Sequence, residues 1–347
     1  MKKVMLSGLL LGVFCWAQER PRLLGISHIA VRVKNLDASR KFYTGLLGYQ
    51  EAFTIRKDGT AVTGGGLSQS QAASIFFKVN NRQYIVLVPE TSPDQARYVD
   101  AGIETDNAEA MRLFLKSLGY AVPDKVEKNA TSDLSFHFKD PGGNSWEIIQ
   151  YTPASLSVQN VGKFMNDERP AQRILHVGIS PRNRQAVDFY FKAFALREFW
   201  RSDRTMFAPG RENNRPASDV SGPVLAGTTN AKLAESDDYL EFNLSAGQGA
   251  ATATSANTKN GGRGSAAAGG GGGGHIALLV PDMAKAMAFV KAKLGWKDYP
   301  RAGQTEAHIG VNHKWQGNFF DPDGTRSEFM EPDTADGLPS PMSRASY

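Results

Sequence analysis

The chain has 347 residues, which is longer than one ordinary domain and predicts two. Its composition, 41% hydrophobic and 22% charged, is that of a folded protein able to bury hydrophobic cores. The formal net charge is +5, but the Lys and Arg residues are dispersed and form no basic run of the kind that contacts phosphates, which argues against a nucleic-acid partner.

Residues 1–17 have the features of an export signal. A lysine pair is followed by an apolar run, and Ala17 ends a small-residue cleavage pattern. The run is shorter than the ~20 apolar residues that a spanning helix needs. We therefore expect a cleaved signal peptide, no stable membrane insertion afterwards, and export to the periplasm or medium of a bacterium. Cys15 is the only cysteine, so the mature chain would form no disulfide.

One structural unit is predicted to recur along the rest of the chain. It consists of an apolar strand, an amphipathic helix and three short strands. An Asp-Pro-x-Gly turn precedes the last strand in the second and fourth copies. The four copies open at His28, Asp100, His176 and His275.

The helices of these units contain apolar residues at helical spacing. In the fourth unit, Met287, Val290 and Leu294 fall on one helical face, which we expect to be buried. Aromatic pairs occupy similar places in the first and third units, at 42–43 and 189–190. We interpret these aromatic residues as core residues rather than cofactor contacts.

Three stretches interrupt the units. The polar segment 153–170 lacks strong periodicity and is the expected boundary between the two halves. Residues 209–237 are rich in Pro, Gly and Asn and are predicted to form a long loop. Residues 245–274 are almost entirely Gly, Ala, Ser and Thr, which cannot bury enough apolar surface to fold, so they are predicted to be a flexible linker.

The repeated βαβββ unit, its Leu-Gly helix ends and its Asp-Pro-x-Gly turns resemble the vicinal oxygen chelate superfamily. That superfamily includes glyoxalase I, fosfomycin- and bleomycin-resistance proteins and extradiol dioxygenases. The likeness extends from Leu24 to Met330. It implies an α+β protein whose four modules pair into two cupped-sheet domains, residues 24–152 and 171–331, the second with the Gly-rich insertion 245–274. Its metal ligands lie on the first and last strand of each module.

The resemblance implies a complete metal site in the C-terminal half. His176 and His275 lie on the first strands of its two modules, and Glu241 and Glu328 lie on the last strands. Two imidazoles and two carboxylates suit Zn, Ni, Mn or Fe(II). Both glutamates stand in otherwise apolar strands, where a bound cation would offset the cost of burying a carboxylate.

The N-terminal half departs from this ligand pattern. His28 and Glu147 match ligand positions, but Val86 stands where a glutamate is expected and cannot bind a metal. Asp100 or its neighbour Val99 takes the place of the second histidine. We therefore expect this half to have lost its metal.

The remaining histidines are weaker indicators, because an isolated histidine in a strand is more often structural. His137 and His308 are expected to face the surface or to satisfy backbone groups. His313 could reach the pocket as an acid or base.

Three functions remain open, each with a small-molecule substrate or ligand, and a homodimer is compatible with all of them. The first is a glyoxalase-type lyase or isomerase, in which Glu241 or Glu328 moves a proton as general base at a metal-bound substrate. An exported protein has little access to cytosolic glutathione, which argues against the usual glyoxalase substrate.

The second candidate is an Fe(II) extradiol-type ring-cleavage dioxygenase. Its triad of two histidines and one carboxylate would be His176, His275 and Glu328. Glu241 argues against it, because a fourth ligand would crowd the position that oxygen needs. The third candidate is a non-catalytic small-molecule binding protein of the bleomycin-resistance kind, and the incomplete ligand set of the N-terminal half fits it better.

Overall fold

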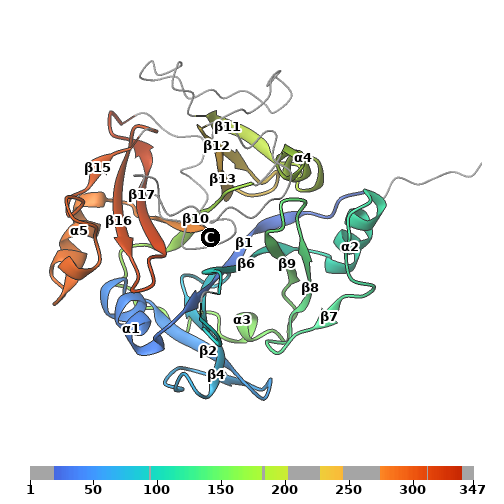
Figure 1. The fold of residues 1–347 in the computed structure, drawn as a ribbon, viewed down its shortest axis with the longest axis horizontal. Helices are drawn as coiled ribbons and strands as arrows, with labels where there is room; N and C mark the ends of the chain where they lie inside the picture. The colour runs from blue at the N-terminus through green and yellow to red at the C-terminus, as the bar shows by residue number, and fades with distance from the viewer. Residues whose placement is uncertain are drawn as a thin grey trace, which may run out of the picture.

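The computed structural model describes residues 19–93, 95–181, 184–201, 227–244, 274–310 and 312–337. The predicted signal peptide, nearly all of the predicted linker 245–274 and most of the predicted loop 209–237 lie outside these residues. Two curled sheets make up the described molecule (Figure 1). None of the described helices has the length and apolar character needed to cross a membrane.

The N-terminal half is a sheet of nine strands in the order β3-β2-β4-β5-β1-β6-β9-β8-β7. Its two βαβββ modules meet at the pair β1 and β6, and the first module contains the additional short strand β3. The elements are β1 (Leu23–Val33), α1 (Leu36–Arg40) with a π-helical turn (Lys41–Leu46), β2 (Gln50–Arg56), β3 (Ala61–Thr63), β4 (Ala72–Lys78), β5 (Tyr84–Pro89), β6 (Tyr98–Thr105), α2 (Ala108–Ser117), β7 (Glu127–Lys128), β8 (Leu134–Lys139) and β9 (Ser145–Gln150).

The C-terminal half is a sheet of eight strands in the order β11-β12-β13-β10-β14-β17-β16-β15. A short helix, α3 (Leu156–Gln159), lies in the predicted boundary segment between the halves. The elements of this half are β10 (Arg173–Ile179), α4 (Arg184–Ala193), β11 (Arg197–Arg201), β12 (Gly227–Lys232), β13 (Tyr239–Leu244), β14 (His275–Leu279), α5 (Met283–Lys291), a 3₁₀ turn (Trp296–Asp298), β15 (His308–Ile309), β16 (Lys314–Phe320) and β17 (Arg326–Thr334). The α+β class and the four paired βαβββ modules are thus confirmed.

The helices begin and end where the sequence supplies caps. The side chains of Asn107 and Asp282 accept backbone N–H groups three residues later, at the first turns of α2 and α5. The Leu-Gly pairs that follow the helices place Gly48, Gly119 and Gly295 at positive φ of 79°, 85° and 75°. Glycine adopts this conformation without strain and reverses the chain toward the next strand.

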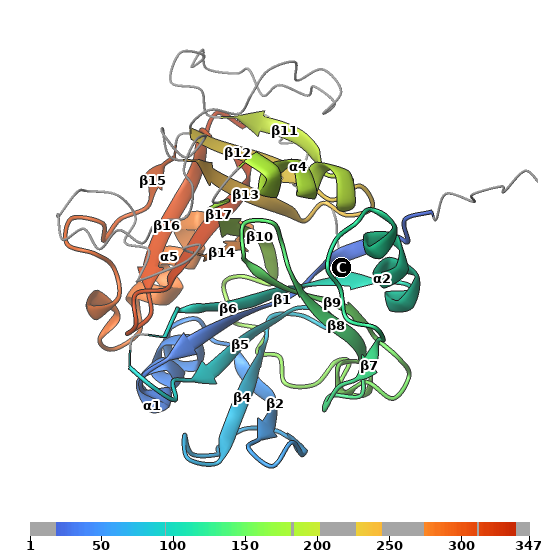
Figure 2. The same ribbon diagram turned by 45° about the vertical axis from the view of Figure 1, so that its right-hand side comes forward.

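The two halves pack against each other as one unit through crossed hydrogen bonds. Tyr43, in the first module, donates to the Asp321 carboxylate of the fourth module at 3.0 Å. Tyr190, in the third module, donates to Asp140 of the second module. Figure 2 shows the two sheets meeting along β1, β6 and β10. The interpretation of the helical aromatic pairs as core is confirmed, because Tyr43 and Tyr190 are fully buried.

Two local predictions are wrong. Strand β12 lies inside the predicted loop 209–237, where pairing with both β11 and β13 outweighs the loop-like composition. Leu294 is 104% exposed rather than buried, because α5 ends at Lys291 and the chain turns away before completing that face.

Candidate metal centre

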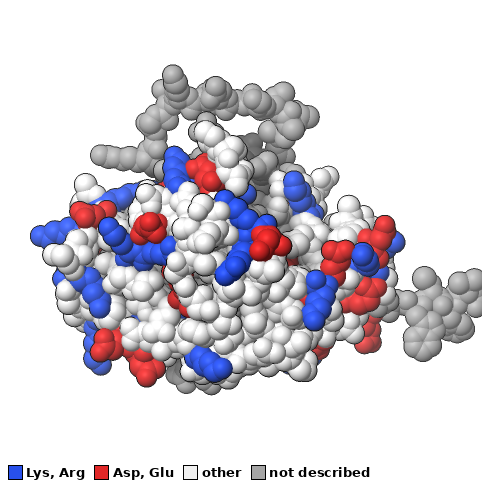
Figure 3. Space-filling view, turned by 90° about the horizontal axis from the view of Figure 1, so that it is seen from below, with Lys and Arg blue, Asp and Glu red and all other residues white. Residues whose placement is uncertain are grey.

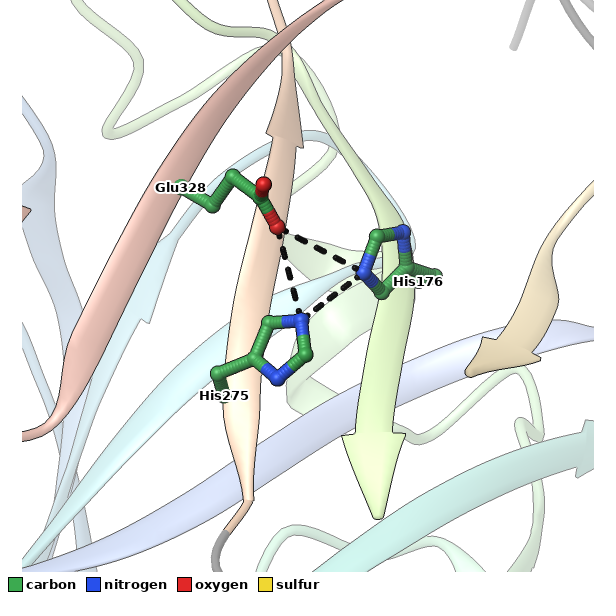
Figure 4. A group of neighbouring side chains, drawn as sticks. All are labelled: His176, His275 and Glu328. Atoms are coloured by element: carbon green, nitrogen blue, oxygen red, sulfur yellow. Dashed lines mark hydrogen bonds and ion pairs between the residues drawn. The ribbon is translucent and has the colours of Figure 1, made fainter. Parts of the chain in front are cut away.

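Three buried side chains of the C-terminal half converge on one point. The Nε2 atoms of His176 and His275 lie 3.0 Å apart. The Glu328 carboxylate oxygen Oε2 lies 3.8 Å from His176 Nε2 and 3.4 Å from His275 Nε2 (Figure 4). These separations suit ligands of one ion, since two ligands each about 2.1 Å from a tetrahedral Zn²⁺ lie about 3.4 Å apart. Of the described residues, these three form the candidate metal-binding group.

Glu241 stands beside this group as a fourth donor. Its Oε1 is 3.4 Å from His275 Nε2, and its Oε2 is 3.7 Å from His176 Nε2. The side chain is 12% exposed, against 3% for Glu328, so it lies nearer to solvent. The Asn243 amide donates to Glu241 Oε1 at 3.2 Å and holds its orientation. All four residues predicted from the sequence therefore lie within one site.

The strand register explains why residues so far apart in sequence meet. Gly178 of β10 pairs with His275 of β14 on one side and with Glu241 of β13 on the other. A Cβ atom at Gly178 would lie 1.9 Å from the His275 ring. Only glycine leaves room for the imidazole to lie over this strand. Gly178 is thus a site residue that the search for ligand-type side chains did not find.

Burial and neighbouring charges shift the pKa values of the site residues in different directions. Burial, together with His275, holds the pKa of His176 well below its usual range, so this ring is neutral and able to bind a cation. Burial and the neighbouring Glu328 raise the pKa of Glu241. Burial would also raise the pKa of Glu328, but Arg326 and the imidazoles outweigh it and lower that pKa. Glu328 is therefore the firmly ionised carboxylate of the pair.

Three polar residues around the site were missed at the sequence level. Asn230 of β12 pairs directly with Glu241, and Asn318 of β16 pairs directly with Glu328. Both asparagines are buried, and their Oδ1 atoms have no hydrogen-bond partner among the described residues. An Arg326 guanidinium nitrogen lies 3.5 Å from Glu328 Oε2. Knowing the partner strand and its register would have identified the two asparagines, whereas Arg326 stands two residues before Glu328 on β17 itself.

The N-terminal half places its corresponding residues at the same register positions. Ala30 pairs with Asp100 and with Val86, as Gly178 pairs with His275 and Glu241. His28 Nε2 lies 3.2 Å from Asp100 Oδ1 and 3.5 Å from Glu147 Oε2. Of the two alternatives left open by the sequence, Asp100 and Val99, the structure places Asp100 beside His28. Val86 is buried and supplies no donor.

Comparison with known proteins agrees with this architecture. Residues 25–148 match the family model described as the Glyoxalase/Bleomycin resistance protein/Dioxygenase superfamily. No curated protein matches the chain.

Solved structures are similar to the chain over both halves. An extradiol ring-cleaving dioxygenase from B. fuscum has 16% identity and a TM-score of 0.57, covering 94% of this chain and 76% of that one. The Mn(II)-bound glyoxalase from Novosphingobium aromaticivorans has 16% identity and a TM-score of 0.55, covering 93% and 90%. A variant of homoprotocatechuate 2,3-dioxygenase from Brevibacterium fuscum has 15% identity and a TM-score of 0.56, covering 91% and 74%.

The paired cupped sheets define a protein with the vicinal oxygen chelate fold and a candidate metal site in its second half. The family-model match covers residues 25–148, in the N-terminal half, which are thus similar to the glyoxalase, bleomycin resistance protein and dioxygenase superfamily, and the solved structures share the fold over both halves.

Proposed function

We propose that the chain is a metal-dependent lyase or isomerase of the glyoxalase type that acts in its C-terminal half. The observation that carries the proposal is the position of Glu241, a fourth and more exposed donor beside the compact group of His176, His275 and Glu328. The similar fold of a Mn(II)-bound glyoxalase, nine-tenths of which this chain covers, supports the same reaction class.

The donor set fits a divalent cation such as Zn, Ni, Mn or Fe(II). It combines two imidazoles, one of them kept neutral by burial, with two carboxylates. His176, His275 and Glu328 would hold the ion, with Glu241 as the exchangeable fourth ligand. A bound cation would act as a Lewis acid on two neighbouring oxygens of the substrate.

Side chains of the protein would carry out proton transfer and substrate binding. Glu241 is the candidate general base, because its carboxylate is the more accessible one and could take a proton from one substrate carbon and return it to the next. Asn243 holds the carboxylate in place. The buried amides of Asn230 and Asn318 lie beside the two glutamates, where they can bind polar groups of the substrate.

The test uses the full chain stripped with chelator and reloaded separately with Zn²⁺, Ni²⁺, Mn²⁺ or Fe²⁺. Hemithioacetals of methylglyoxal with several small thiols serve as probes, and solvent deuterium incorporation into the product reports proton transfer. We expect turnover with deuterium exchange, and we expect Glu241→Gln to lower turnover about 10²- to 10⁴-fold. Equal turnover by Glu241→Gln would remove Glu241 from the mechanism.

The second candidate is Fe(II)-dependent cleavage of a catechol ring. The compact group of two histidines and one carboxylate favours it, because this is the ligand set of non-haem Fe(II) oxygenases. Two solved dioxygenases also share the fold. Catechol-dependent oxygen uptake by the Fe(II)-loaded protein, without turnover of the hemithioacetals, would favour ring cleavage over the lyase.

Export of the protein is also part of the proposal, since residues 1–17 have the pattern of a signal peptide. An exported lyase would act on adducts of extracellular or periplasmic thiols rather than on those of cytosolic glutathione. Amino-terminal sequencing of protein recovered from the periplasm or medium tests this, and an intact first residue in a cytosolic fraction would contradict it.

A further inference from the structure

The end of the hairpin formed by β16 and β17 carries further side chains on the face of the metal centre. Asn318 pairs with Glu328, and Phe320 pairs with Arg326. Directly paired residues of antiparallel strands project to the same side of a sheet, and so do residues two apart on one strand. Phe320 and Arg326 therefore lie on the same face as Glu328, about 7 Å farther along the strands.

A cavity of about 370 Å³ lies beside Phe320. The turn after α5 and the connection between β16 and β17 line it together, with apolar side chains and one guanidinium contributed by Tyr299, Pro300, Arg301, Phe320 and Pro322. Small-molecule sites run from about 300 to 1,000 Å³, so this volume suits one short group of a substrate rather than a whole cofactor.

Two guanidinium groups flank Phe320. The Cζ atom of Arg301 lies 4.0 Å from the centroid of the Phe320 ring. A guanidinium held over a ring in this way keeps the N–H groups at its edge free to bind an anion. Arg326 lies 3.5 Å from Glu328 Oε2, and its side chain is 27% exposed. This single contact leaves most of its N–H groups available to a ligand.

Two carboxylates also line the cavity, but neither is paired with Arg301. Asp321 is buried and accepts the Tyr43 hydroxyl and two backbone N–H groups. Asp298 is directed back toward its own turn, since its Oδ2 lies 3.4 Å from where a Cβ of Gly295 would stand. Within the described part of the chain, the Arg301 guanidinium thus has a ring for a neighbour and no ion pair.

The molecular surface does not attract anions over a broad area. Over the face that Figure 3 shows, Lys and Arg side chains are interspersed with Asp and Glu, so no field of one sign covers it. At Phe320, in contrast, two arginines share one carboxylate contact, that of Arg326 with Glu328. The attraction for an anion there is local.

We propose that Arg301 and Arg326 bind a carboxylate of the substrate, whose carbon chain packs against Phe320. The inference rests on the proposed function and names the class of its substrates, the adducts of α-oxoaldehydes with small thiols that carry a carboxylate. Guanidinium groups recognise carboxylates through paired N–H···O bonds, which a lysine cannot reproduce. The separation of about 7 Å from Glu328 lets one small molecule reach both the metal centre and the two arginines.

The first test measures binding without turnover. (Methylthio)acetate and its uncharged amide, 2-(methylthio)acetamide, are titrated by calorimetry into the full chain in chelator, which removes any ion that a carboxylate could ligate. The proteins are wild type, Arg301→Gln, Arg326→Gln and Arg326→Lys, which keeps a charge beside Glu328. Lys297→Gln is the matched control, because it removes an exposed charge from the neighbouring 3₁₀ turn. Circular dichroism verifies that each variant is folded.

Wild type and Lys297→Gln should bind the carboxylate at least about tenfold more tightly than the amide, since hydrogen bonds to charged groups are the stronger ones. Arg301→Gln and Arg326→Gln should each lose this preference, and Arg326→Lys should keep only part of it. Equal binding of the two probes by wild type would overturn the proposal, and so would a full preference in either glutamine variant.

The second test compares turnover of the methylglyoxal hemithioacetals of mercaptoacetate and 2-mercaptoethanol by the metal-loaded chain. In wild type and Lys297→Gln, kcat/KM should favour the mercaptoacetate adduct by at least about tenfold. Arg301→Gln should remove the preference mainly through KM, because the contact is made equally in the ground state and the transition state.

The two tests separate this inference from the proposed function. Turnover of both adducts without preference would overturn the carboxylate site and leave the proposed function intact. No turnover of either adduct, together with carboxylate binding that Arg301→Gln abolishes, would overturn the proposed function and leave the carboxylate site in place.

Discussion

The two halves of the molecule place different side chains on the same scaffold. In the C-terminal half, Gly178 pairs with Glu241. In the N-terminal half, the corresponding residue, Ala30, pairs with Val86. The difference continues on the neighbouring strand, where Asn230 faces Glu241 and Phe76 faces Val86. One half thus keeps a polar wall on this side of its site, while the other fills the corresponding space with apolar side chains.

The two halves also differ in the residues on the other side of the site. His275 corresponds to Asp100, and Asn318 corresponds to His137. Each half therefore has two imidazoles, but the N-terminal half takes its second one from β8, a strand nearer the edge of its sheet. The comparison shows that the register of the fold fixes where donors can stand. The side chains at a few positions then decide whether a site binds tightly, weakly or not at all.

The largest expected effect comes from placing the valine of the N-terminal half at the corresponding position of the C-terminal half. Glu241→Val should lower turnover about 10²- to 10⁴-fold, because it removes the candidate general base. The remaining three donors should still bind the ion, so elemental analysis should find metal. Loss of the metal together with activity would show that Glu241 is mainly a ligand, and Glu241→Gln serves as the isosteric control.

A smaller effect concerns pH and the contact between the halves. Burial raises the pKa of Asp321 from 3.8 to about 6. The native state therefore binds this proton more tightly than the unfolded state, and the stability so gained is lost as pH rises from about 4 to about 6. Asp321→Asn does not titrate.

Relative to wild type, Asp321→Asn should therefore gain up to about 3 kcal/mol of unfolding free energy between pH 4 and pH 7. Chemical unfolding at the two pH values measures this. Asp106→Asn, at an exposed carboxylate, is the control. A difference from wild type that is the same at both pH values would contradict the assignment.

The reverse exchange, Val86→Glu, should cost about 2 kcal/mol or more of unfolding free energy, because it buries a carboxylate beside Phe53 and Tyr84. Denaturant unfolding measures the loss, and Val86→Gln separates the effect of charge from that of size. A loss no larger for Val86→Glu than for Val86→Gln would contradict the cost assigned to the buried charge.

The smallest expected effects lie at the crossed hydrogen bonds. Tyr43→Phe and Tyr190→Phe each remove a buried donor to an aspartate of the other half. Each should lower the unfolding free energy by about 1 to 2 kcal/mol. Tyr43→Phe removes the Tyr43 donor to Asp321 Oδ2, and Tyr190→Phe leaves Trp146 Nε1, which donates to the Tyr190 hydroxyl at 3.0 Å, without that acceptor. Denaturant unfolding measures the loss, with Tyr151→Phe as a control whose hydroxyl bonds within the N-terminal half. No loss in either variant would mean that these bonds do not join the halves.

The modules and the four C-terminal donors could be predicted because they recur in the chain with the same local pattern. His176 and His275 open apolar strands, and Glu241 and Glu328 interrupt them, which is visible without knowing any pairing. Residues that matter through their partner strand could not be found this way. Asn318 and Gly178 acquire their places at the site from the register of β16 with β17 and of β10 with β14.

Predictions from local sequence were also wrong where the structure depends on contacts with other segments. The segment containing β12 reads as a loop, but it forms a strand because β11 and β13 supply partners on both sides. Leu294 continues a helical pattern past the point where the helix ends. In the first case the deciding effect is nonlocal, and in the second the helix already ends at its C-cap, Ala292, before the chain reaches Leu294 and the positive-φ Gly295.

The measurement that tests the central claim most directly is metal binding by purified wild-type protein and His275→Ala under limiting metal. The account predicts that wild type takes up one equivalent of metal and that His275→Ala loses it, with at least about a hundredfold weaker binding, because one of three converging ligands is gone. Equal binding by the two proteins would contradict a metal centre built on His176, His275 and Glu328.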